Sequence, residues 1–373
     1  MSKHDQFLIN LLKQFLSLDS SQVTENEMLE IEWNHILYQG TLHRILPIVY
    51  HEIVDSRLAH LLNANFLKLL RIFSEKAAET DMKFQQEASS ISEMLLEHDI
   101  NAVIMKGPLN SLLLYPRSGC RIYEDLDILV SKSQLKAVKS ILEKCGYQQG
   151  IVEIGSQIFK KADRGEIVLK ELHTHETVEF HRLDHHRPSE ISIDVNHSLS
   201  WKGHRDYPGF PEFTASAFLE RKQWHSHNDL AILGPAVEEL LLYLILHLYN
   251  EAVFFCWQVC WQYNFGDIQL IKYVDVILAC QRIEDWDCVH SLILRYQIKE
   301  PVQYVITCIV ELFGDTAVPN ELKKYITDIH LVDYYYNKLG EKLYWSTAWT
   351  QRIFNQKLRL EDALDHNSKE GIL

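Results

Sequence analysis

The sequence predicts an α+β fold in which a small mixed sheet with helices is flanked by two helical regions. Apolar residues recur at helical spacing over most of residues 1–98. Short apolar runs separated by polar turns, which are typical of strands, fill residues 99–210. Helical periodicity returns over residues 211–373. We therefore predict an N-terminal helical region, a sheet-bearing core and a C-terminal helical region with these boundaries.

Composition and charge narrow the class of protein. The 373 residues include 47% hydrophobic residues, enough for a large core, and 51 acids against 37 bases give a net charge of −14. This balance argues against binding a long nucleic acid, for which basic patches are expected. The seven cysteines lack disulfide-framework spacing, which predicts reduced thiols and a cytoplasmic location. Cys256 and Cys260 could share a metal, but no matching pair follows at zinc-finger spacing.

No targeting or membrane segment is expected. The N-terminus is polar through Asp5 and lacks a small-residue cleavage site, so it does not resemble a signal peptide. The most apolar run, residues 240–248, is far shorter than the roughly 20 residues that cross a bilayer. We interpret it as a buried helix and expect no membrane partner.

The N-terminal region should lead directly into the core. Its apolar spacing predicts helices at about 4–17, 25–38, 41–54 and 57–98, the last broken once or twice. Ala102–Met105 then reads as a short buried strand, followed at once by Lys106, Gly107 and Pro108. Glycine permits close approach of a ligand, and proline favours the first position of a helix. A strand, a glycine turn and a helix start form a plausible phosphate cradle, to which Lys106 and Arg121 would add positive charge.

The strongest chemical signal is a pair of aspartates in an apolar run. Asp125 and Asp127 lie in the segment Asp-Leu-Asp-Ile-Leu-Val, which predicts a strand. Side chains of a strand alternate faces, so both carboxylates share one face, roughly 7 Å apart. Such a pair is also found at solvated hairpin edges. Next to the Lys-Gly turn, however, it favours an Mg²⁺ site that receives a substrate phosphate.

A third carboxylate is expected on a later hairpin. Residues 177–183 and 191–199 read as two extended segments around a polar loop at 184–190. Alternation places Asp194 on one face with Ser192 and Asn196, opposite the apolar face. Asp194 is therefore our candidate, although a solvent-facing aspartate is the simpler alternative and Glu179 is a rival for the same role.

Together these residues resemble a known family. The order strand, Lys106-Gly107, helix, Tyr115-Pro116, Gly119-x-Arg121 and Asp125-x-Asp127 is similar to the uncharacterised nucleotidyltransferases of the polymerase-β-type superfamily. The resemblance is strongest over about residues 90–200 and implies a polymerase-β-like nucleotidyltransferase core. The chain departs from the superfamily in having Gly-Pro where Gly-Ser is usual, and in the 17 positions from Pro108 to Asp125, a spacing that is commonly shorter.

The resemblance implies a reaction and a set of roles. It implies an Mg²⁺-dependent enzyme that transfers a nucleoside monophosphate from an NTP, such as ATP, to a hydroxyl or phosphate, releasing pyrophosphate. Asp125, Asp127 and Asp194 would be the catalytic metal ligands for one or two ions, with Mn²⁺ as a substitute. Lys106, Gly107 and Arg121 would bind the nucleotide.

The acceptor and the donor stay open. A small metabolite, an antibiotic-like compound modified in natural-product tailoring, or a modified peptide would each fit as acceptor. The same fold could use another phosphate-linked donor such as a nucleotide sugar. The chain could also be a non-catalytic nucleotide-binding module with a residual metal site, a reading that Pro108 keeps open.

The remainder of the chain adds weaker signals. Ser133–Cys145 reads as a helix, residues 151–199 as strands and loops, and later helices are expected at about 235–261, 266–281, 285–295, 300–313 and 319–357. His247 and Lys272 look like positions that the family uses near the cleft. The alternatives are a satisfied core histidine and a helix ion pair of Lys272 with Asp275. Trp257 and Trp261 more simply belong to the core. Seven histidines match no zinc spacing and are read as surface residues: 173, 175, 181, 185, 186, 197 and 204.

Overall fold

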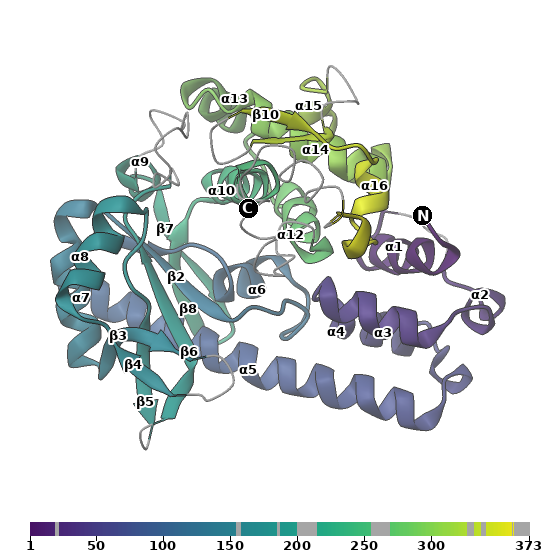
Figure 1. Ribbon diagram of the computed structural model, residues 1–373, viewed down its shortest axis with the longest axis horizontal. Helices are drawn as coiled ribbons and strands as arrows, with labels where there is room; N and C mark the ends of the chain where they lie inside the picture. The colour runs from purple at the N-terminus through teal and green to yellow at the C-terminus, as the bar shows by residue number, and fades with distance from the viewer. Residues whose placement is uncertain are drawn as a thin grey trace. The chain divides into compact units, whose positions relative to one another are not determined.

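The computed structural model divides the chain into two compact units. It describes residues 1–18, 22–153, 158–184, 187–199, 215–254, 269–326, 332–336, 341–359 and 361. One unit combines Met1–Ala77 with Leu241–Leu373, and the other is Ala78–Leu240 (Figure 1). Helices α5 (Ala64–Glu97) and α10 (Val237–Tyr249) each contribute to both. The region boundaries at residues 98 and 210 stay a prediction.

The unit Ala78–Leu240, called the sheet unit below, is built on a six-stranded mixed sheet. Its strands follow the order β1-β2-β6-β5-β3-β4. They are β1 (Ala102–Ile104), β2 (Asp125–Val130), β3 (Tyr147–Val152), β4 (Phe159–Lys161), β5 (Phe180–Asp184) and β6 (Arg187–Asn196). Strand β2 pairs antiparallel with β1 and parallel with β6. The mixed sheet with its helices confirms the predicted α+β class.

Strand β2 forms the centre of the core. Leu126, Ile128, Leu129 and Val130 are each 0% exposed, as expected for a strand covered on both faces. The parallel pairing places Asp127 directly opposite Asp194 of β6. The apolar residues that predict this strand therefore also determine how deeply its two aspartates are buried.

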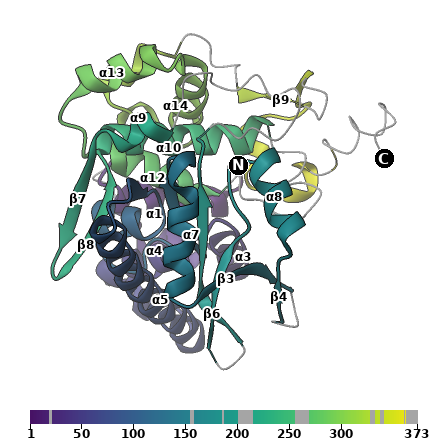
Figure 2. The same ribbon diagram turned by 90° about the vertical axis from the view of Figure 1, so that its left-hand side faces the viewer.

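Helices and a second hairpin cover this sheet. They are α6 (Pro108–Leu114), η2 (Lys132–Gln134), α7 (Leu135–Lys144), α8 (Arg164–His173), α9 (Ala215–Leu219), β7 (Lys222–His227) and β8 (Leu230–Pro235). Helix α7 lies against β3 (Figure 2), and α9 lies against β2. Pro108 occupies the first turn of α6, as predicted. Helix α8 corrects the assignment of residues 151–199 to strands and loops. Its signal was a capping box in which Asp163 and Glu166 each accept a hydrogen bond from the other's backbone N–H.

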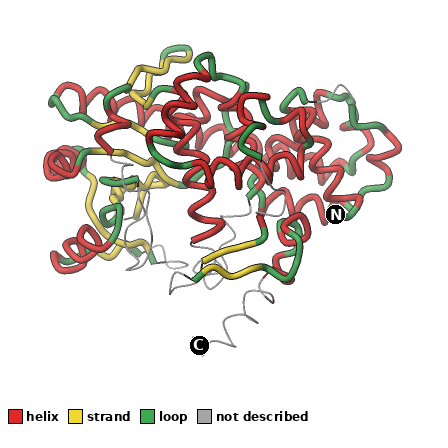
Figure 3. Tube along the Cα trace, turned by 90° about the horizontal axis from the view of Figure 1, so that it is seen from above, coloured by secondary structure: helices red, strands yellow, loops and turns green. Residues whose placement is uncertain are grey.

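The other unit is mainly helical. Its elements are α1 (Lys3–Phe15), α2 (Glu25–Leu29), α3 (Trp33–Leu42), α4 (Leu46–Asp55), η1 (Ala59–Leu61), α10 (Val237–Tyr249), the π-helix η3 (Asn250–Phe254), α12 (Leu270–Cys280), α13 (Trp286–Arg295), α14 (Lys299–Phe313), η5 (Asp315–Ala317), α15 (Asn320–Lys323), β9 (Tyr334–Tyr336), β10 (Lys342–Tyr344) and α16 (Trp349–Arg352). The helix predicted over 319–357 is wrong, because β9 and β10 pair antiparallel there (Figure 3). Three consecutive tyrosines favour a strand over a helix.

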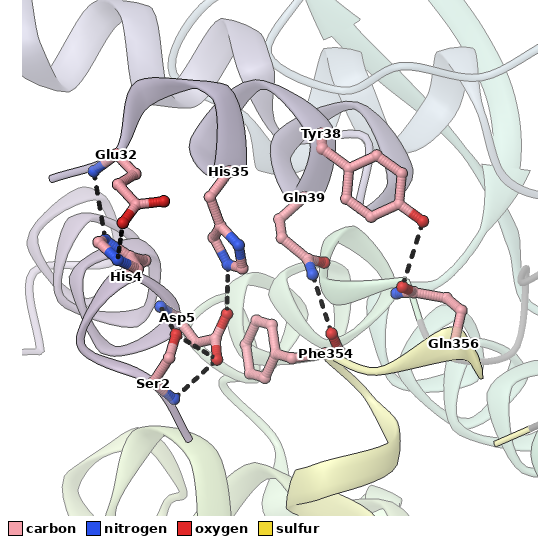
Figure 4. A network of polar contacts seen from close by, with 9 residues as sticks. All are labelled: Ser2, His4, Asp5, Glu32, His35, Tyr38, Gln39, Phe354 and Gln356. Atoms are coloured by element: carbon pink, nitrogen blue, oxygen red, sulfur yellow. Dashed lines mark hydrogen bonds and ion pairs between the residues drawn. The ribbon is translucent and has the colours of Figure 1, made fainter. Parts of the chain in front are cut away.

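Polar contacts join the two ends of the chain within this unit (Figure 4). Gln39 Nε2 donates to the carbonyl of Phe354 at 2.9 Å, across 315 positions of sequence. Near the N-terminus, His35 Nε2 lies 2.7 Å from Asp5 Oδ1, which ties α3 to α1. Asp5 also closes the capping box of α1 with Ser2. Residues far apart in sequence therefore belong to one compact unit.

Two further expectations concern membranes and cysteines. None of the helices that the structure describes is long and apolar enough to cross a bilayer. Cys120, Cys145, Cys280, Cys288 and Cys308 are free thiols. Cys256, Cys260, Trp257 and Trp261 lie outside the described residues.

Candidate metal and nucleotide site

Three carboxylates meet at one place on the sheet. Asp125 and Asp127 extend from β2, and Asp194 extends from the adjacent parallel strand β6. One carboxylate oxygen of each lies within 4.8 Å of the others, and among the described residues this is the only such group able to hold a metal ion. Asp127 is 4% exposed, whereas the side chain of Asp125 is 35% exposed. The acids therefore run from the core toward solvent.

A lysine and an asparagine contact the buried acid. Lys106 lies shortly after β1. The residue before it, Met105, donates its backbone N–H to the carbonyl of Asp127. The Lys106 ammonium lies 3.2 Å from Asp127 and 3.8 Å from Asp125. Asn196 Nδ2 donates to Asp127 Oδ1 at 3.2 Å. One lysine thus faces a cluster of three carboxylates.

The electrostatics show an excess of negative charge. Burial raises the pKa of Asp127 to about 7; the charge of Lys106 opposes this rise, and the charges of Asp125 and Glu176 add to it. Withdrawal from water also raises the pKa of Asp194 well above its ordinary value, with further contributions from the other carboxylates. Carboxylates crowded in this way favour either protons or a cation. A hard divalent cation with oxygen ligands fits them.

Gly107 forms the turn next to these acids. Its φ of +61° is a conformation that residues with a side chain rarely adopt. A Cβ there would come within 3.0 Å of the Asp125 carbonyl oxygen and 3.2 Å of the Tyr123 ring. Only glycine lets the turn approach β2 this closely. Arg121 is nearly buried and donates from Nη1 to the carbonyl of Ile122.

A further acid and lysine lie beside the cluster and were missed by sequence analysis. The backbone of Thr177 donates to Val195 at 3.0 Å, which aligns residues 175–177 with the end of β6. The Glu176 carboxylate raises the pKa of both Asp127 and Asp194. Lys170 of α8 pairs with Glu176 at 2.9 Å. No motif marks these residues, because Lys170 is positioned by α8 and Glu176 by the alignment of residues 175–177 with β6.

Glu179 occupies a different position from Asp194. Its side chain is 49% exposed and lies 3.3 Å from His181 Nε2. This contact with His181 lowers the pKa of Glu179. The structure thus groups Asp194, and not Glu179, with Asp125 and Asp127.

The surface assignment of the histidines is wrong at two positions. His181 is 5% exposed and His197 is 9% exposed. His175 is partly buried, and its burial lowers its pKa to about 4, so that it is neutral at pH 7. His185, His186 and His204 lie outside the described residues. His181 and His197 are therefore buried residues and not surface residues.

His247 and Lys272 meet in the mainly helical unit. Lys272 forms an ion pair with Glu251, and His247 Nε2 lies 3.6 Å from the same carboxylate. The ring of Tyr243 stacks on His247 at 5.8 Å between centroids. Glu251 belongs to the π-helix that follows α10, an irregularity often found at functional sites. A role for these residues in contacting the acceptor stays a prediction.

A comparison with protein families identifies the family of this chain. The sequence model of the family described as uncharacterised nucleotidyltransferase matches residues 30–314, so the chain belongs to this family. A comparison with curated proteins found no match. Among solved structures, the chain is similar to an antigenic nucleotidyltransferase-like protein from Paracoccidioides brasiliensis, with 14% identity and a TM-score of 0.37. That match covers 64% of this chain and 92% of the other.

Proposed function

We propose that this chain is an Mg²⁺-dependent enzyme that transfers a nucleoside monophosphate from an NTP to a hydroxyl or phosphate of a small-molecule or peptide acceptor. The observation that carries the proposal is the convergence of Asp125, Asp127 and Asp194 within 4.8 Å. Such oxygen ligands suit Mg²⁺, with Mn²⁺ as a substitute. Membership of the nucleotidyltransferase family supports a nucleotide donor.

Each residue has a role in this proposal. When bound, Mg²⁺ would neutralise charge on the phosphates and align the attacking and leaving oxygens. Asp125, Asp127 and Asp194 would hold the ion, and Lys106 and Arg121 would neutralise the triphosphate. Gly107 would let the donor approach the backbone. Positioning and charge neutralisation account for most of the catalysis in phosphoryl transfer.

Asp194 would act on the acceptor. In the proposed step, the acceptor oxygen forms a bond to the α-phosphorus while the bond to the bridging oxygen breaks and pyrophosphate leaves. The acceptor's proton would pass to the Asp194 carboxylate, which lies on β6 opposite Asp127 of β2. Asn196 would hold Asp127 in place through its hydrogen bond.

Calorimetric binding of the four NTPs, each with and without Mg²⁺, tests the proposal. We expect metal-dependent binding of at least one NTP, weakened roughly 100-fold in Asp125→Asn because a metal ligand is lost. Asp229→Asn, which removes the same charge from the turn between β7 and β8, is the matched control. Binding of no NTP by the wild type would contradict the proposal. A product mass that increases by a hexose would identify a nucleotide sugar as donor instead.

A further inference from the structure

Asp81, on the part of α5 that belongs to the sheet unit, lies at the centre of a hydrogen-bond network. It is 2% exposed. Its Oδ2 accepts bonds of 2.7 Å from the hydroxyls of Ser111 and Ser118 and from the N–H of Gly119. Its Oδ1 accepts from the Tyr123 hydroxyl at 2.5 Å and from Gln85 at 3.1 Å. Five neutral donors therefore compensate the burial of this carboxylate.

The donors belong mainly to one stretch of chain. Ser111 lies in α6, Ser118 and Gly119 lie in the loop after it, and Tyr123 stands two residues before Asp125. This stretch joins the Lys106-Gly107 turn to the first metal ligand. The hydrogen bonds of Ser111, Ser118 and Tyr123 all converge on Asp81, which therefore holds this stretch at three separate points.

Tyr123 carries the effect of Asp81 to the candidate site. Its ring lies against Gly107, where an added Cβ would come within 3.2 Å of Tyr123 Cδ2. Phe84 of α5 packs edge-on against the same ring at 5.1 Å between centroids. The same added Cβ would come within 3.0 Å of the Asp125 carbonyl oxygen. A displacement of the tyrosine ring would therefore move both the glycine turn and the start of β2.

We propose that Asp81 and Tyr123 form a clamp that positions the Gly107 turn and Asp125 for binding metal and nucleotide. Its importance for metal binding rests on the function proposed above. Neither residue touches the reacting atoms, so both are positioning residues. In metal proteins, loss of a group that orients a ligand typically weakens metal binding roughly 10- to 100-fold.

The same helix offers a matched control. Glu87 accepts a hydrogen bond of 2.7 Å from the Tyr147 hydroxyl and pairs with Arg182 at 3.0 Å. Tyr147 is 1% exposed and Tyr123 is 7% exposed. Both tyrosines thus donate to a carboxylate of α5, but Tyr147 belongs to β3, away from the Gly107 turn. Tyr123→Phe and Tyr147→Phe each remove one buried hydroxyl.

Hydrogen exchange of the metal-free protein tests the clamp directly. For Tyr123→Phe, we expect amides of residues 106–114 and 121–126 to exchange about fivefold to tenfold faster, since loss of a hydrogen bond promotes local opening. Tyr147→Phe should leave these peptides unchanged. Asp81→Asn should give the larger effect. Equal exchange in the wild type and Tyr123→Phe would overturn the proposal.

Mn²⁺ titration separates this proposal from the proposed function. We expect Tyr123→Phe to raise the Kd for Mn²⁺ roughly tenfold and Tyr147→Phe to leave it within about twofold. Equal Kd values for the wild type and Tyr123→Phe would overturn the role of the clamp in metal binding. If the wild type bound no Mn²⁺, the metal site itself would be wrong, while the exchange experiment would still decide whether the clamp positions the turn.

Discussion

Asp81 and Asp127 are two buried aspartates of the same unit, with 2% and 4% of their surfaces exposed, and their surroundings are opposite in kind. Asp81 accepts five hydrogen bonds from neutral groups. Asp127 has one amide donor and one lysine, and it faces two further carboxylates. A carboxylate whose oxygens all accept hydrogen bonds holds the surrounding chain in place. Crowded carboxylates without enough donors leave negative charge that a bound cation can neutralise.

Substitution by asparagine should separate the two positions most strongly. At pH 8 in chelator, Asp81→Asn should lower the free energy of unfolding by about 2–4 kcal/mol, because an amide cannot accept all five bonds. Asp127→Asn should raise it by roughly 1–3 kcal/mol, because the uncompensated charge is removed. Urea denaturation measures both.

Opposite signs are the essential outcome of that comparison. Asp229→Asn, at an exposed turn, controls for the loss of one negative charge. A loss of stability in Asp127→Asn as large as that in Asp81→Asn would show that Asp127 is held as firmly as Asp81. The charge imbalance assigned to the metal site would then be wrong.

The pH dependence of stability sharpens the same contrast. The pKa of Asp127 is raised from 3.8 to about 7 in the folded protein, so the unfolded chain loses its proton first as pH rises. The stabilising contribution of this group is therefore complete below pH 3.8 and is lost as pH rises through 7. The wild type should lose roughly 2–4 kcal/mol relative to Asp127→Asn between pH 4 and pH 8.

Metal binding should show the complementary pH dependence. A protonated carboxylate cannot bind the ion, so Mn²⁺ affinity should rise as pH increases toward 7 and then level off.

For the pH dependence of stability, denaturation profiles of the wild type and Asp127→Asn, measured side by side, cancel the titration of other acids. Parallel profiles would show that Asp127 has an ordinary pKa.

The sequence predicted the parts of the site that one short stretch contains. Strand β2, its two acids and the glycine turn follow from local apolar patterning and from Gly107-Pro108. Asp194 was predicted from alternation along its hairpin, because Ser192, Asp194 and Asn196 share a face. These features depend on the two-residue alternation of strand side chains and on turn-forming residues, both of which can be read directly from a sequence.

Tertiary contacts account for what the sequence did not show. Asp81 lies within a long amphipathic helix, where an isolated aspartate looks like a solvated residue. Four of its five donors come from 30 to 42 positions away. Glu176 approaches the cluster only because residues 175–177 align with the end of β6. The pairing of β9 with β10 has a local cause, since the run of tyrosines at Tyr334–Tyr336 favours a strand over the helix predicted at 319–357.

Substitution of Lys106 should change the binding free energies by an intermediate amount. Its ammonium lies beside Asp127 and Asp125, so it partly compensates the charge that a metal would neutralise. At pH 8.5, Lys106→Met should strengthen Mn²⁺ binding by about 1 kcal/mol, because repulsion of the cation falls. The same variant should weaken NTP binding by a similar amount. Calorimetry measures both affinities, with exposed Lys132→Met as control. Weaker Mn²⁺ binding would mean that Lys106 organises the carboxylates instead of competing with the ion.

The smallest effect is expected at Glu179, the rival third carboxylate. Its side chain is 49% exposed and is engaged with His181, so Glu179→Gln should change Mn²⁺ affinity by less than about 0.5 kcal/mol. Asp194→Asn, on the neighbouring strand β6, removes the same charge and should weaken binding far more, because Asp194 converges with Asp125 and Asp127. Mn²⁺ titration of both variants compares the two positions directly. A large loss of Mn²⁺ affinity in Glu179→Gln with little loss in Asp194→Asn would reverse the assignment. The third metal ligand would then be Glu179 and not Asp194 of β6, the strand that pairs parallel with β2.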